Sequence, residues 1–232
     1  MLERLGFEAL ATSSSALAFT FGKLDGGAPP QRVFDHARAL SLATELPVSV
    51  DLENGYGPEP EDAARAIERT AAAGAVGGSI EDYDPELGIY DVGRAAERVA
   101  AAAEAAAALD FPFTLTARAE NQIRGNPDLD DTIARLRAYE EVGADVLYAP
   151  GLRDAAEIAA VCEAVSRPVN VLAHSGLSVP EIAAAGAQRI SVGGALAWVA
   201  VEAMAAAAEA MRDRGDLSAL AGPARVREWL GG

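Results

Sequence analysis

Short runs of apolar and β-branched residues alternate along the chain with longer, alanine-rich segments. In the longer segments apolar residues recur every three or four positions, which is the period of an amphipathic helix. The short runs lack that period, and their nearly unbroken hydrophobicity is typical of strands that are buried on both faces. The pattern predicts seven strands, over residues 8–13, 48–52, 77–82, 113–120, 146–150, 168–173 and 189–194.

Helices are predicted between and after these strands. Strict alternation of strand and helix indicates a parallel sheet that is covered by helices. Gly-Ala-Val at 74–76 and Gly-Ala-Asp at 143–145 lead directly from a helix into the next strand, as αβ loops do. No internal linker interrupts the pattern, so we expect one domain over residues 1–232. The predicted helices cover residues 30–45, 59–74, 92–109, 129–142, 154–166, 178–186 and 196–214.

Two α/β architectures fit this alternation, an open doubly wound sheet and a (β/α)₈ barrel of the TIM type. The doubly wound sheet usually has a glycine fingerprint after its first strand, but the first strand here ends in ATSSSA. A barrel gathers polar residues at the carboxyl ends of its strands, and this chain does so. Seven strands are one too few, and the opening MLERLG has the pattern of a helix tail. We therefore predict a barrel that lacks its first strand. The polar strand-end residues are Ser13, Ser14, Ser15, Asp51, Glu53, Glu81, Asp82, Arg118, Glu120, Asn170, His174 and Ser191.

Composition excludes several classes of protein. A formal net charge of -16, without any basic stripe, argues against binding to nucleic acid. No window approaches the roughly eighteen unbroken apolar residues of a membrane span, and the first residues are too short and acidic for a signal peptide. We expect a soluble, cytoplasmic protein. The single cysteine, Cys162, excludes an internal disulfide framework and is interpreted as a packed apolar residue.

The segment VSVDLENGYG, residues 48–57, ends a predicted strand in two carboxylates. Asp51 and Glu53 are two positions apart, so both project to the same side of the strand end. Glu81 ends the neighbouring predicted strand. Three carboxylates packed together repel one another unless a cation is present. Mg²⁺ fits such a site, because it prefers oxygen ligands, keeps several waters and is commonly held by one or two carboxylates.

Five segments, in this order and with these spacings, resemble the isocitrate lyase and phosphoenolpyruvate mutase superfamily: VDLENGYG, GGSIEDYD, FTLTARAEN, GADVLYAPG and PVNVLA. The resemblance covers nearly the whole chain. It implies a (β/α)₈ barrel that binds Mg²⁺ and cleaves or forms C–C or P–C bonds in small α-keto or α-hydroxy carboxylates. The family's first strand would precede Met1, which agrees with the strand count.

The resemblance also implies a metal site. It makes Asp51 a direct or water-mediated Mg²⁺ ligand, with Glu53 and Glu81 completing an acidic shell through water. Asp25, in the loop FGKLDG, matches a further acidic position beside the metal. Taken alone, an acidic residue such as Asp25 is more often a helix cap or a solvated loop residue.

The resemblance assigns the substrate's neighbours as well. Arg118 matches an arginine that contacts the substrate, and residues 13–15 match a segment that binds its carboxylate or phosphonate end. Arg118 could instead pair structurally with Glu120 or Glu81. Asn170 and His174 lie at the same end of the predicted barrel and are further candidates. The substrate-binding set is therefore Ser13, Ser14, Ser15, Arg118, Asn170 and His174.

The loop EDYDPELGIYD, residues 81–91, departs from the family. Lyases of the family carry a Lys-Lys-Cys-Gly-His type motif there, and the phosphonomutases carry a lysine and an asparagine. This loop contains no cysteine, lysine, histidine or asparagine. The proton donor is therefore unassigned, with Tyr83, Tyr90 and Glu120 as candidates beside the catalytic Arg118.

These observations predict a Mg²⁺-dependent lyase that acts on a small α-keto or α-hydroxy carboxylate through an enolate-like intermediate. Two alternatives stay open: a P–C bond enzyme, such as a phosphonomutase or phosphonopyruvate hydrolase, and a truncated barrel without turnover. The predicted helix 196–214 carries a broad apolar face, and a second short helix is predicted around ARVREWL. Because the resembling family forms tetramers, we expect a homodimer or homotetramer built on residues 196–232. The face comprises Leu196, Val199, Val201, Met204, Ala208 and Met211.

Overall fold

The computed structural model describes residues 1–220 and 224–229 and contains one seven-stranded sheet in which every neighbouring pair is parallel. All seven predicted strands are present. Within the described residues the edge strands β1 and β9 each pair on one side only. The prediction of a parallel sheet one strand short of a barrel is confirmed. In sheet order the strands are β1 (Leu10–Ala11), β2 (Val48–Asp51), β3 (Gly77–Glu81), β6 (Thr114–Arg118), β7 (Val146–Tyr148), β8 (Val169–Leu172) and β9 (Arg189–Ser191).

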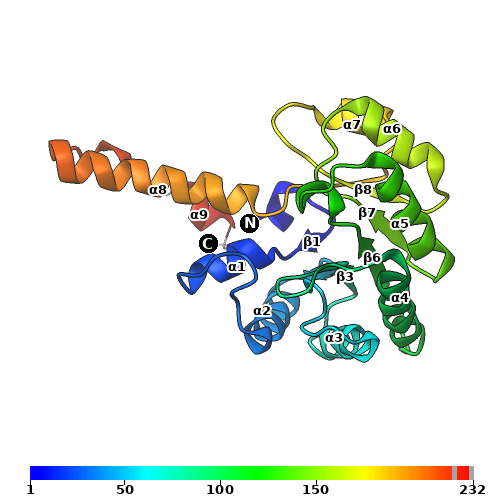
Figure 1. The fold of residues 1–232 in the computed structure, drawn as a ribbon. Helices are drawn as coiled ribbons and strands as arrows, with labels where there is room; N and C mark the ends of the chain where they lie inside the picture. The colour runs from blue at the N-terminus through cyan, green and yellow to red at the C-terminus, as the bar shows by residue number, and fades with distance from the viewer. Residues whose placement is uncertain (221–223, 230–232) are drawn as a thin grey trace.

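Helices cover the outside of this sheet, and α8 projects away from it (Figure 1). All the predicted helices are present, with ends that differ by a few residues at most. The last predicted helix is present as α9, although residues 221–223 and 230–232 lie outside the described part of the chain. No helix of the described residues is long and apolar enough to cross a membrane. The helices are α1 (Ser14–Thr20), α2 (Pro30–Ala43), α3 (Pro60–Ala72), α4 (Val92–Ala107), α5 (Leu129–Glu141), α6 (Ala155–Ala164), α7 (Val179–Ala184), α8 (Ala195–Arg214) and α9 (Ala224–Trp229).

Some short elements were not predicted. Helix α1 has seven residues and begins after Ser13, whose hydroxyl accepts the Ala16 amide hydrogen at 3.4 Å. Strands β4 (Tyr83–Asp84) and β5 (Gly88–Ile89) form an antiparallel hairpin in the loop after β3. Elements this short leave too few positions for a hydrophobic period to show. The 3₁₀ turns at Glu3–Leu5, Asn121–Ile123 and Ser218–Leu220 were missed for the same reason.

The two faces of the sheet differ in polarity. On the inner strands of the sheet the side chains that face the helices are apolar and almost fully buried, as Val50, Ile80 and Leu147 show, each at most 1% exposed. Residues paired in register across a parallel sheet share a face. The inner face therefore carries a row of mostly polar side chains from five neighbouring strands. The hydrophobic core lies between sheet and helices, and the interior of the curl is polar. The row consists of Glu81, Arg118, Tyr148, Asn170 and Arg189.

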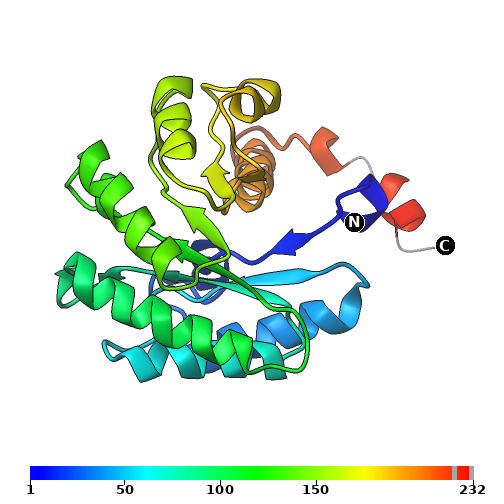
Figure 2. The same ribbon diagram turned by 90° about the vertical axis from the view of Figure 1, so that its right-hand side faces the viewer.

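Two contacts show how strongly the sheet curls. The Arg189 guanidinium on β9 donates to the Thr116 hydroxyl on β6 at 3.1 Å, although β7 and β8 lie between these strands in the sheet. At the carboxyl end, the rings of Phe19 in α1 and Trp198 in α8 meet edge to face with centroids 5.4 Å apart. Figures 1 and 2 both place the N-terminal turn beside α9. The helices that follow the two edge strands thus bring the ends of the sheet together.

Candidate functional site

Arg118, the last residue of β6, lies at the centre of an acidic cluster at the carboxyl end of the sheet. Its guanidinium is 3.2 Å from the Glu81 carboxylate and 3.5 Å from that of Asp51, and its Nε donates to Glu120. Burial lowers the pKa of Arg118, but these carboxylates together raise it well above the ordinary value. The guanidinium is therefore a permanent cation, held between residues of β2, β3 and the end of β6.

The segment after β1 is joined to Asp51. The Ser14 amide donates to the Asp51 carboxylate at 3.0 Å, and the Ser14 hydroxyl donates to Asp25 at 2.8 Å. The hydroxyls of Ser13 and Ser15 are 3.0 Å apart. The predicted serine segment, Asp25 and Asp51 therefore come together at one end of the curl.

Glu53 follows β2 in a left-handed backbone conformation, with φ of 51°, as does Tyr56, with φ of 67°. Such angles are uncommon for residues other than glycine and persist where the surroundings enforce them. The Glu53 Oε1 atom is buried without a hydrogen-bond partner in the described structure. Burial, followed by the charges of Asp51 and Asp25, raises the pKa of Glu53 to about 7. A carboxylate in this state is stabilised by a proton or a nearby cation.

Glu81 is a second carboxylate whose charged form is disfavoured by its surroundings. Burial raises its pKa well above the usual range; Arg118 opposes this shift, and Glu120 and Asp51 add to it. Among the described residues no group of three acidic, histidine or cysteine side chains stands ready to bind a metal directly. Mg²⁺ is often held by one or two carboxylates and several waters. The donor set of Asp51 and the partnerless Glu53 oxygen fits that mode of binding, with Glu81 and Asp25 beside it.

Arg124 is a residue that the sequence interpretation missed. Its Nε donates to Glu120 at 3.0 Å, and its guanidinium lies 3.9 Å from the centroid of the Tyr83 ring. Glu120 is fully buried, and its carboxylate contacts two guanidiniums, those of Arg118 and Arg124. This makes Glu120 a residue that positions Arg118. Tyr83 is held over the same cluster by the hairpin.

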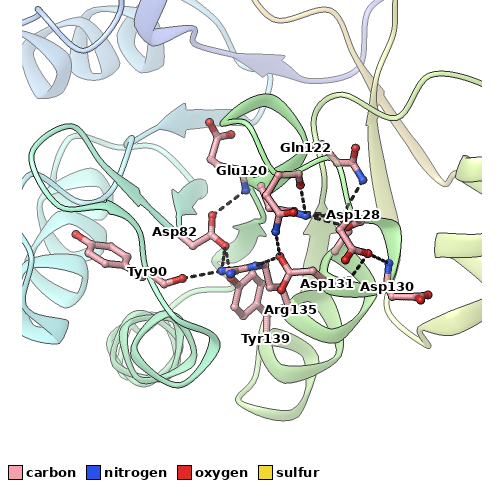
Figure 3. Close-up of polar contacts among 12 residues, drawn as sticks. Asp82, Tyr90, Glu120, Gln122, Asp128, Asp130, Asp131, Arg135 and Tyr139 are labelled. Carbon is pink, nitrogen blue, oxygen red and sulfur yellow. Dashed lines mark hydrogen bonds and ion pairs between the residues drawn. The ribbon is translucent and has the colours of Figure 1, made fainter.

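Asp82 faces away from this cluster. Its carboxylate accepts the Glu120 amide hydrogen at 2.7 Å, an Arg135 guanidinium hydrogen at 2.9 Å and the Tyr139 hydroxyl (Figure 3). Arg135 also donates to the Tyr90 carbonyl at 2.8 Å. These bonds tie the end of β3 to α5 and to the segment that carries Glu120. Asp82 is therefore a structural anchor behind the site.

The remaining candidates divide into two groups. Asn170 is 3% exposed on the inner face and donates to the Ser191 hydroxyl at 3.0 Å. His174 is exposed, and its Nδ1 accepts the Gly176 amide hydrogen at 3.0 Å. The Tyr90 hydroxyl lies within hydrogen-bond distance of Asp84 and Asn54, at 3.3 Å from each, and thus anchors the hairpin. Asn170 lies in the row that contains Arg118, whereas, among the described residues, His174 contacts only its own loop and Tyr90 holds the hairpin against Asn54.

The sequence and the fold of this chain are similar to those of known proteins. A model of the family described as phosphoenolpyruvate phosphomutase matches residues 1–212. A solved structure from Burkholderia cenocepacia J2315, named only broadly as a lyase or mutase, is 51% identical, with a TM-score of 0.95 over 100% of this chain and 86% of that one.

Two curated relatives have more specific names. The oxaloacetate decarboxylase of Bradyrhizobium diazoefficiens is 31% identical over 69% of this chain and 57% of its own length. The 2-methylisocitrate lyase of Halalkalibacterium halodurans is 30% identical over 72% of this chain and 56% of its own length. The chain thus spans somewhat more than half the length of these two enzymes.

Proposed function

The chain belongs to the phosphoenolpyruvate mutase and isocitrate lyase family, and from this premise we propose that it is a Mg²⁺-dependent lyase that breaks a C–C bond in a small α-keto or α-hydroxy carboxylate. One observation carries the proposal: a buried guanidinium, Arg118, lies between carboxylates that outnumber it. Enolate chemistry needs positive charge where an oxygen becomes negative. The names of the two curated relatives favour a C–C bond over a P–C bond.

Asp51 and Glu53 are the residues that would hold the metal, with Glu81 and Asp25 contacting its waters. The buried, partnerless oxygen of Glu53 supports this assignment, because an unpaired carboxylate there is costly without a cation. When bound, Mg²⁺ supplies positive charge beside the α-oxygen of the substrate.

Side chains of the site carry out the remaining steps, which are substrate binding, orientation and proton transfer. Arg118 orients the substrate and stabilises the oxygen that gains charge, while Glu120 holds Arg118 in place. The serine segment 13–15 binds the carboxylate end. Tyr83, held against Arg124 at the cluster, is the proposed proton donor. Asn170 contributes a polar contact from the inner face.

A P–C bond enzyme is the second candidate, because the matching family model is named for a phosphomutase. Supplying a phosphonate substrate and a C–C substrate in parallel assays distinguishes the two. Release of inorganic phosphate, as from a hydrolase, or conversion of the phosphonate to a phosphate ester, as by a mutase, would favour the second candidate. Absence of turnover on either class, with metal binding retained, would favour a barrel without turnover.

The test of the site is a calorimetric titration of Mg²⁺ with and without oxalate, which mimics a pyruvate enolate. For the wild type we expect oxalate to tighten Mg²⁺ binding. Asp51→Asn keeps the size of the side chain and removes its charge, so Mg²⁺ affinity should fall about tenfold or more. Arg118→Lys keeps charge but loses the planar fork, so oxalate binding should suffer more than Mg²⁺ binding.

A matched control is Asp35→Asn, an exposed carboxylate on α2 that pairs with Arg32. This variant should bind Mg²⁺ as the wild type does. Equal Mg²⁺ affinity in Asp51→Asn and the wild type would refute the metal site.

We also propose a homodimer or homotetramer built on α8. This helix buries only Ala210 among its described residues, while Val199 and Met204 are 67% and 66% exposed. So much exposed apolar surface on one projecting helix is typical of an interface. Light scattering at micromolar concentration should give a multiple of the monomer mass, and Val199→Glu should shift the mass toward the monomer. A monomeric wild type would contradict the proposal.

A further inference from the structure

Arg189 is a second guanidinium on the inner face of the sheet. It begins β9 and donates to the Thr116 hydroxyl at 3.1 Å. Within the described residues no carboxylate lies within 4 Å of it, in contrast to Arg118. Burial lowers the pKa of Arg189, opposed by Tyr148. A half-buried cation without a carboxylate partner is unusual in a chain with a net charge of -16.

Asn170 is the register partner of Arg189 on the neighbouring strand β8. The Asn170 side chain is 3% exposed, and its amide nitrogen donates to Ser191. Its Oδ1 atom has no partner in the described structure. Buried polar groups normally find a partner, and each exception needs an explanation. In the described part of the chain, a buried acceptor without a partner and a cation without a carboxylate therefore lie side by side on one face.

The position of this pair relative to Arg118 follows from the strands. Thr116, which Arg189 contacts, precedes Arg118 by two residues on β6 and shares its face. Tyr148 lies between Arg118 and Asn170 in the register row, with its ring centroid 5.5 Å from the Arg118 guanidinium. Through its contact with Thr116, Arg189 lies nearer than Arg118 to the amino ends of the strands. It is on the side of the polar interior that carries no acidic residue of the cluster.

We propose that Arg189 and Asn170 form a second anion subsite, which binds a carboxylate of the substrate remote from the bond that breaks. The carboxylate accepts hydrogen bonds from the free guanidinium hydrogens of Arg189, and a neighbouring hydroxyl of the substrate donates to Asn170 Oδ1. This inference rests on the proposed function and narrows it to a hydroxy dicarboxylate. A monocarboxylate held at Arg118 would leave Arg189 without a carboxylate and Asn170 Oδ1 without a donor.

The alternative is that Arg189 serves only to tie β9 to β6 through Thr116. Two probes separate these roles: oxalate, which is short enough to be held at Arg118 alone, and malate, which carries a second carboxylate and a hydroxyl. Binding of each is measured by calorimetry, with and without Mg²⁺. The variants are Arg189→Gln, Arg189→Lys and Thr116→Val, which removes the tie and keeps the cation. Arg65→Gln, at an exposed arginine of α3, is the control.

For Arg189→Gln we expect malate affinity to fall at least about tenfold and oxalate affinity to stay within about twofold. Arg189→Lys, which keeps the charge without the fork, should recover part of the malate affinity. Thr116→Val and Arg65→Gln should bind both probes as the wild type does. Unchanged malate affinity in Arg189→Gln, or equal losses for both probes, would overturn the subsite. If Arg189→Gln fails to fold, a malate affinity in Arg189→Lys equal to that of the wild type overturns it.

The outcome is distinguishable from failure of the proposed function. Arg189-dependent malate binding without any coupling of Mg²⁺ to oxalate would retain the subsite and reject the metal-dependent lyase. Coupling of Mg²⁺ to oxalate, with malate binding that ignores Arg189, would retain the lyase and reject the subsite. A wild type that does not bind malate under either condition also rejects the subsite.

Discussion

Glu81 and Asp82 are consecutive residues at the end of β3, and both are buried carboxylates beside an arginine. Their surroundings differ because strand alternation sends them to opposite faces. Asp82 accepts from an amide, a guanidinium and a phenol, so both of its carboxylate oxygens have hydrogen-bond donors. Glu81 shares Arg118 with other carboxylates, and its pKa is raised by burial. Burial and an arginine partner therefore do not by themselves identify a functional carboxylate.

The number of donors available to the carboxylate oxygens is the more useful criterion. Around Asp82, two carboxylates share Arg135, and Tyr139 supplies a further donor. The inner cluster contains more carboxylates than cations, and one carboxylate oxygen has no donor. An excess of negative charge is costly in the unliganded protein and becomes favourable when a cation binds. The cluster sets five carboxylates against two guanidiniums: Asp25, Asp51, Glu53, Glu81 and Glu120 against Arg118 and Arg124.

The largest expected effect comes from Asp82→Asn. This change removes the charge that partners Arg135 and weakens the bond to Tyr139, so the free energy of unfolding should fall by about 3–5 kcal/mol. Urea denaturation measures the change. A loss below about 1 kcal/mol would mean that Asp82 is not the anchor that the contacts indicate.

A smaller effect is expected from pH in the absence of divalent metal. Burial raises the pKa of Glu53 from 4.5 to about 7, so the folded state binds a proton more tightly than the unfolded state. Stability should therefore decrease as pH rises from about 4.5 to 7, by about 2 kcal/mol after allowance for solvent screening, and should level off above pH 7.

Glu53→Gln should remove this component of the pH dependence, and saturating Mg²⁺ should reduce it. Thermal denaturation at several pH values gives the comparison, with Asp35→Asn as a control that retains the slope. A Glu53→Gln protein with the slope of the wild type would assign the effect to other groups.

The smallest effect on stability is expected from Glu81→Gln, which completes the comparison with Asp82. Removing one charge from an over-acidic cluster relieves repulsion and weakens the bond to Arg118, so the free energy of unfolding should change by less than about 1 kcal/mol without metal. The same variant should weaken oxalate binding in the presence of Mg²⁺. A loss as large as that of Asp82→Asn would erase the distinction between the two carboxylates.

The strands and helices were predictable because their hydrophobic periods extend over enough residues to be recognised. Asp51, Glu81 and Arg118 were found because they end strands whose carboxyl ends meet. Arg124 was missed because it directly follows a 3₁₀ turn, Asn121–Ile123, whose path no periodicity reveals. The left-handed turn at Glu53 depends on packing around β2 and is likewise invisible in the sequence.

Arg189 could have been found from the sequence. Ser191 was recognised as a strand-end residue, and alternation puts Arg189 on the same face two positions earlier. The same rule separates Glu81 from Asp82. What alternation could not supply was the contact with Thr116, because it depends on how strongly the sheet curls.

The polar inner face also bears on how such a protein can change over evolutionary time. Its hydrophobic core lies mainly on the other side of the sheet, around residues such as Leu115 and Val171. Substitutions at inner positions such as Ser79, Thr116 or Ser191 therefore alter the polar inner face without creating cavities in that core. Substitutions at a few inner positions can thus change which substrates bind, while the residues that pack the core are selected separately for stability.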